Sequence, residues 1–137
     1  VIGKVQLKKL NYILKQNSKR YNILEKKLND QIERRGITKN SNIIHDTFII
    51  KINDDVKRNK VISILKKLSF GTKNLPDALE WHCSFFWDHA LDKNQIKRST
   101  EDKNKLIKMV AIPILLRKNL KQYNKLAIEI NKVFKFK

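Results

Sequence analysis

The residues of this chain whose types could do chemistry are concentrated in one stretch, Gly71–His89, which reads GTKNLPDALEWHCSFFWDH. It holds both tryptophans, two of the three histidines and the only cysteine. Imidazoles titrate near neutral pH, and indole rings stack on sugars and on other proteins. We therefore expect this connector to present a polar and aromatic surface to a ligand or to another domain.

Each candidate residue has a functional and a structural interpretation. Lys73 and Asn74 can reach an anionic group of a substrate, or they belong to a solvated loop. His82 can form a hydrogen bond in a substrate pocket or within the core, and Trp81 can stack on a ligand or pack inside the domain. The substrate-side candidates are His82, Trp81, Lys73, Asn74, Asp88 and His89.

No motif for catalysis, for a cofactor or for a metal accompanies these residues. The chain has no Gly-rich phosphate loop, no GxSxG and no HExxH. His82 and His89 would be about 10 Å apart along a helix, and no third ligand supports a metal site. His82 and Cys83 would point to opposite faces of an extended chain, so we expect no reactive Cys–His pair. Asp88 and His89 are expected to form a structural charged pair.

The formal net charge of +18 is the second conspicuous property of the chain. Lys, Asn and Ile, which A and T alone can encode, make up 57 of the 137 residues, so a low-GC genome accounts for much of this charge. Only six of the 31 basic residues are Arg, the residue that reads bases and clamps phosphates through two parallel hydrogen bonds. A solvated lysine-rich surface is therefore expected, with no specific nucleic-acid partner.

Elements that could position the connector follow from hydrophobic periodicity. An apolar stripe predicts one long amphipathic helix over residues 3–33, ended by Gly36. The β-branched run 45–52 predicts a strand, and Asn53-Asp54-Asp55 offers a cap to a following helix. Residues 37–43 are expected to form a loop. The stripe of the first helix comprises Leu7, Leu10, either Ile13 or Leu14, Tyr21, Leu24 and Leu28.

The second half of the chain predicts shorter elements. Residues 69–72 are expected to start a short strand and residues 92–100 to form a loop. Pro113 confines the apolar run 109–115 to a sheet edge or a strand end. The remaining expected elements are a helical turn at 76–80, a short helix at 99–108 and an amphipathic helix at 119–134. This order predicts an α+β fold, a small sheet covered by helices.

The length predicts a single domain over residues 1–137. No apolar run reaches the roughly 18 residues of a membrane span, so no membrane partner is expected. Cys83 is alone and no secretory leader pattern is present, so the expected location is cytoplasmic. Because the chain opens on Val1 and not on Met, we expect it to be a C-terminal fragment of a longer protein.

Several blocks, taken in order, resemble the C-terminal part of the DegT/StrS-type sugar aminotransferases. Residues 2–11 are similar to the family's G-x-x-Q-L-x-x-L run, and residues 20–24 match its R-x-x-Y-x-x-L run loosely, since Arg20 and Tyr21 are adjacent. The family's Y-x-P-x-H stretch is replaced by Asn74–His82, with His82 in the position of its histidine. The other similar blocks are residues 45–52, 61–71, 111–114 and 120–134.

The resemblance implies the small domain of a fold-type I pyridoxal-phosphate enzyme that aminates a keto sugar, usually nucleotide-linked, with glutamate as amino donor. The Schiff-base lysine and the other cofactor-binding residues of the family belong to a large domain that would precede residue 1. This chain would contribute substrate contacts within a homodimer. A family subgroup acting on sugar acids such as amino-octulosonates has a run similar to Thr72–His82, so a sugar acid is an alternative substrate.

Other functions remain open at the level of sequence. The chain could be a basic α+β module that binds nucleic acid, or a dimerisation domain whose long first helix pairs with a copy of itself. The family also contains dehydratases and regulators.

Overall fold

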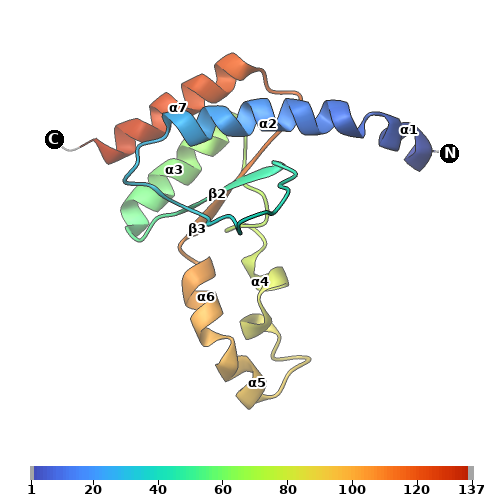
Figure 1. Ribbon diagram of the computed structural model, residues 1–137. Helices are drawn as coiled ribbons and strands as arrows, with labels where there is room; N and C mark the ends of the chain where they lie inside the picture. Colours follow the sequence, from blue (N-terminus) through green and yellow to red (C-terminus); the bar gives the residue numbers. More distant parts are fainter. Residues whose placement is uncertain (1, 136–137) are drawn as a thin grey trace.

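The fold is a small antiparallel sheet with three long helices on one face and a projecting arm on the other side (Figure 1). The computed structural model describes residues 2–135, so Val1, Phe136 and Lys137 lie outside the described part of the expected domain. Helices and strands are mixed along the chain, which confirms the predicted α+β class.

The sheet has the order β1-β2-β3, with β1 at Glu33–Arg34, β2 at Thr47–Lys51 and β3 at Met109–Pro113. Both pairings are antiparallel, and Phe48 lies opposite Ile112. Side chains alternate between the two faces of a strand. Phe48 and Ile50 therefore point towards the helices, while Ile49 points to the opposite face. Pro113 ends β3, as predicted, where its missing N–H costs no ladder hydrogen bond.

The helix-covered face of the sheet holds the main core. It is covered by α2 (Leu10–Lys27), α3 (Asp55–Lys67) and α7 (Leu120–Phe134). Side-chain caps begin two of these helices: Asp54 accepts a hydrogen bond from the Lys57 amide, and Asn119 forms a capping box with Gln122. The fully buried core side chains include Leu24, Phe48, Ile50, Val61, Leu65, Val110, Ile112, Tyr123, Leu126 and Ile130.

The predicted helix over 3–33 was wrong in its extent. The chain forms α1 (Ile2–Lys8) and α2, separated at Lys9, and α2 ends at Lys27, well before Gly36. A distant residue decides this end: Asn131 of α7 donates to the Lys27 carbonyl at 2.7 Å and accepts from the Asn29 amide at 2.8 Å. These bonds satisfy main-chain groups that an ended helix leaves free, so the chain can turn there.

Two local predictions in the second half were also wrong. Residues 69–72 form no strand, because Ser69 and Gly71 have positive φ and the Phe70 amide bonds back to the Leu65 carbonyl at 2.8 Å, which closes the end of α3. Part of the expected loop 92–100 is helix α5 (Lys93–Arg98), which begins at an Asp92 capping box.

The projecting part of the chain, residues 71–108, is called the helical arm below. It contains α4 (Leu79–His82), the 3-10 turn η1 (Ser84–Phe86), α5 and α6 (Thr100–Leu106). The helical turn expected at 76–80 thus falls slightly later, and the predicted helix at 99–108 is confirmed as α6. Among residues 2–135, no helix has the length and apolar character needed to cross a membrane.

Candidate functional site

The helical arm is attached to the sheet through the outer edge of β3. The Lys73 amide donates to the Ala111 carbonyl at 2.9 Å, and the Ala111 amide donates to the Leu75 carbonyl at 3.1 Å. Residues 73–75 thereby continue the hydrogen bonding of the sheet past its edge strand. This attachment places Lys73 and Asn74 at the border of the sheet face that α2, α3 and α7 leave uncovered, called the open face below.

A second, smaller core joins the arm to the open face. It consists of Leu75, Leu79, Cys83 and Ala111, with Ile49, Phe85, Phe86, Leu106 and Met109 against it. Lys103 adds its ammonium group 4.1 Å from the centre of the Phe85 ring. The arm is therefore held by apolar packing and not only by its two ends.

Helix α4 divides its residues between this core and solvent. Leu79 and Cys83 are buried, whereas Trp81 is 81 % exposed and His82 is exposed. An indole left in water contributes nothing to the packing of its own domain. The structural interpretation of Trp81 and His82 as core residues is therefore wrong, and both side chains are free to meet a ligand or a partner.

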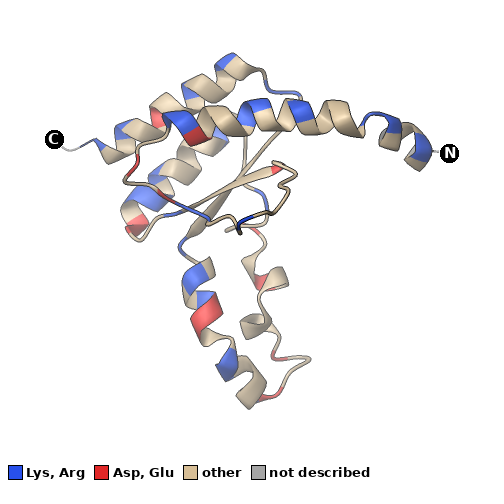
Figure 2. Cartoon of the chain, viewed as in Figure 1, with Lys and Arg blue, Asp and Glu red and all other residues tan. Residues whose placement is uncertain are grey.

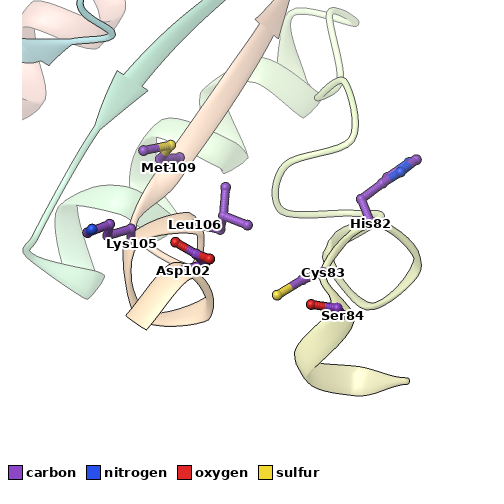
Figure 3. A pocket seen from close by; sticks show the side chains of 7 residues that line it. All are labelled: His82, Cys83, Ser84, Asp102, Lys105, Leu106 and Met109. Carbon is purple, nitrogen blue, oxygen red and sulfur yellow. The ribbon is translucent and has the colours of Figure 1, made fainter. Parts of the chain in front are cut away.

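A hollow of about 360 Å³ lies between the two sides of the arm. Figure 3 shows Cys83 and Ser84 pointing towards Asp102 and Leu106 across it, whereas the His82 imidazole points away. His82 ends α4 and Cys83 is extended, so the two neighbouring side chains diverge. The expected absence of a Cys–His pair agrees with this geometry, and Cys83 is a buried packing residue.

Lys73 and Asn74 line a different hollow, of about 200 Å³, at the edge of the open face. The Lys73 ammonium lies 2.5 Å from the Asp46 carboxylate, just before β2. The hydrogen bond from Lys73 is the main cause that holds the pKa of Asp46 below its ordinary value. Lys73 therefore already has an anionic partner, and an anionic substrate would have to compete with Asp46 for it.

Asp88 and His89 lie beyond η1 and are both exposed. No ion pair joins them within the part of the chain that the structure describes, so the expected charged pair is not formed. The six candidates thus fall into three groups along the arm: Lys73 with Asn74 at its base, Trp81 with His82 on α4, and Asp88 with His89 after η1.

Sequence reasoning missed two residues that organise this region. Asp46 follows the loop before β2, and nothing local marks it as the partner of Lys73, 27 residues away. Arg20 is buried and donates to the main-chain carbonyls of Lys118, Leu116 and Gln16. A buried arginine in an otherwise polar helix position gives no sequence signal of its own, because its acceptors are backbone atoms.

The described residues offer no set of ligands for a metal or for pyridoxal phosphate. Among residues 2–135 no three His, Cys, Asp or Glu side chains are grouped to hold a metal ion. A Schiff-base lysine requires a dry pocket that lowers its pKa. No described lysine is buried, and those of the hollows are paired: Lys73 with Asp46, Lys105 with Glu101. The described residues therefore do not fit the cofactor.

No protein-family model, curated protein or solved structure matches this chain.

Proposed function

We propose that this chain is the substrate-side domain of a pyridoxal-phosphate-dependent aminotransferase that acts on a keto sugar, either nucleotide-linked or a sugar acid, with glutamate as amino donor. The cofactor and its lysine would belong to a separate large domain, because no lysine described here suits that role. The role of this chain would be to hold and orient the sugar.

One observation carries the proposal. The helices α2, α3 and α7 cover a single face of the sheet, so Lys73, Asn74 and the arm lie on the open side, where a second domain can approach. Exposed His82 can donate or accept a hydrogen bond to a sugar hydroxyl, and exposed Trp81 can stack on a sugar ring.

The distribution of charge favours this proposal over a nucleic-acid-binding module. Figure 2 shows Lys and Arg on the long helices, on α1 and on α5 and α6, spread over elements in several parts of the fold. A specific nucleic-acid interface would need a basic face with residues that reach base edges. Five of the six arginines lie outside the arm, dispersed over different elements.

A titration of the chain with nucleotide sugars and sugar acids, followed by residue-resolved NMR, tests the proposal. We expect chemical-shift changes confined to Lys73, Asn74, Trp81 and His82. If the substrate is a sugar acid, a free nucleotide of the same charge should cause no shifts. A His82→Ala variant should lose these shifts and a Lys121→Ala variant on α7 should keep them. Shifts caused by DNA instead, at one clustered set of basic residues, would favour the nucleic-acid function and reject the sugar site.

A further inference from the structure

Charge is unevenly distributed along this chain. Residues 74–92 contain four acidic residues and no Lys or Arg, although the whole chain carries +18. The remaining residues hold all 31 Lys and Arg against nine Asp and Glu. The next longest stretch free of Lys and Arg, residues 40–50, is much shorter. The acidic residues of the stretch are Asp77, Glu80, Asp88 and Asp92.

The same stretch, called the acidic segment below, exposes large aromatic side chains. Trp81 is 81 % exposed and Trp87 is 37 % exposed. In Figure 2 this side of the arm, around α4, shows acidic but no basic colouring. Tryptophan is among the residues most enriched at the centres of protein interfaces, and carboxylates beside it select a basic partner.

A surface of opposite character lies at the N-terminal end of the chain. Residues 1–24 contain six Lys and Arg and no acidic residue. Within them, α1 and the first half of α2 expose apolar side chains, with Leu7 69 % and Tyr12 64 % exposed. We call residues 3–16 the basic helix surface.

The fold explains why this helix surface has no cover. Arg20 bonds to Lys118, so the start of α7 lies beside the middle of α2, and the two helices run in the same direction towards the contact of Lys27 with Asn131. Figure 1 shows α1 and the first half of α2 extending past the end of the body, so the apolar side chains that precede the buried Leu24 on these helices have no cover.

The two surfaces cannot meet within one chain. In Figure 1, α1 extends sideways from the body while the arm projects away from the sheet in a different direction. We propose that the acidic segment of one copy docks on the basic helix surface of a second copy, with the exposed indoles covering the exposed apolar residues. A reciprocal exchange would form both contacts at once in a two-fold dimer.

This inference does not rest on the proposed function. Association between copies through these surfaces requires no sugar and no cofactor, and because it covers the exposed Trp81 indole, a sugar and a second copy would compete for that ring. It would fail in a measurement of oligomeric state, whereas the sugar site would fail in the NMR titration.

Sedimentation velocity of the chain at high-micromolar concentration and about 0.15 M salt tests the proposal. At that ionic strength the screening length is about 8 Å, so repulsion between the two positive bodies is reduced while contact pairs remain. We expect a dimer, with Trp81→Ala weakening it about 10-fold or more because a central indole is lost. A monomer under these conditions would overturn the proposal.

Charge reversal identifies the two surfaces. Glu80 and Asp88 are exposed on the acidic segment, and Lys8 and Lys15 are exposed on the basic helix surface. E80K/D88K and K8E/K15E should each be monomeric alone, and an equimolar mixture should recover the dimer, because both contacts are then attractive again.

A matched control separates a local contact from a general effect of net charge. K121E/K125E on α7 changes the net charge by the same amount as K8E/K15E, at residues that are also exposed. It should leave the dimer intact. Failure of the mixture to recover the dimer, or an equal loss in the α7 variant, would overturn the assignment of the surfaces, and circular dichroism of each variant confirms that it is folded.

Discussion

The ammonium group of Lys73 lies 2.5 Å from the carboxylate of Asp46, and this ion pair joins the base of the arm to the residue that precedes β2. The Asp46 carbonyl also accepts from the Ile114 amide at 2.9 Å, just after β3. Asp46 thus connects the base of the arm, the start of β2 and the end of β3, which are distant in sequence. Its partner Lys73 is one of the residues predicted from the sequence to contact substrate.

The Asp46–Lys73 pair should make stability depend on pH in the acid range. The pKa of Asp46 is lowered in the folded chain. As pH falls towards the ordinary aspartate pKa of about 4, the unfolded chain therefore binds more protons than the folded chain does. The stabilisation is present above that pH and is lost as pH falls through the folded pKa. Asp46→Asn should remove it, and urea unfolding at neutral pH and near pH 3 measures the difference.

The size of this effect should be small. The Asp46 side chain is 54 % exposed, and solvent screens exposed pairs, so we expect less than about 1 kcal/mol at neutral pH. Asp102→Asn on α6, at an exposed carboxylate outside the acidic segment, is the matched control and should change neither value. A loss in Asp46→Asn that is equal at both pH values would show that the ion pair is not its cause.

The buried Arg20 should contribute more to stability than any surface ion pair. Its guanidinium donates at 2.9 Å to the Lys118 carbonyl and at 3.1 Å to the Leu116 carbonyl, and so fastens α2 to the turn before α7. Arg20→Ala leaves these carbonyls without a donor, and we expect a loss of about 2–3 kcal/mol in the free energy of unfolding. Urea denaturation measures it.

Lys19→Ala serves as its control, since Lys19 is the exposed neighbour on the same helix. That change should stay within about 0.5 kcal/mol. Equal effects of the two substitutions would contradict the role of the carbonyl contacts.

His82 should matter for turnover and not for the cofactor. In the enzyme that we propose this chain forms with a cofactor-binding domain, His82→Ala should lower kcat/KM for the sugar about 10-fold or more, equivalent to about 1.4 kcal/mol of transition-state stabilisation. The absorbance of the bound cofactor should remain, because no residue described here fits it. Full activity of this variant would show that His82 does not contact the substrate, and only the α+β fold assignment would then stand.

DNA should bind weakly and without sequence preference. The lysines are dispersed, so affinity should come from counterion release and fall steeply with salt. Fluorescence anisotropy with two unrelated duplexes between about 0.05 and 0.2 M salt measures this. Selective binding that persists at the higher salt would contradict the compositional explanation of the charge.

Local signals were sufficient for the elements that begin at a side-chain cap or carry a clear period. The Asp54 cap and the Asn119 helix start were both predictable, and the β-branched residues of β2 and the position of Pro113 identified two strands of the sheet. The α+β class follows from these elements, since an amphipathic helix and a half-apolar strand each need a partner to bury one face. Helix α5 was missed although its Asp92–Gln95 box is also local, because polar residues were interpreted as a loop.

Tertiary structure decided what depends on distant partners. The end of α2 depends on Asn131, the ion pairing of the substrate candidate Lys73 depends on Asp46, and the burial of Arg20 depends on carbonyls almost a hundred residues away. The amino-acid sequence alone determined the fold class, and it placed both tryptophans and two of the three histidines in the connector Gly71–His89. The exposure of Trp81 and His82 was decided only when the arm packed Leu79 and Cys83 inward, because burial is a property of the assembled faces and not of any residue alone.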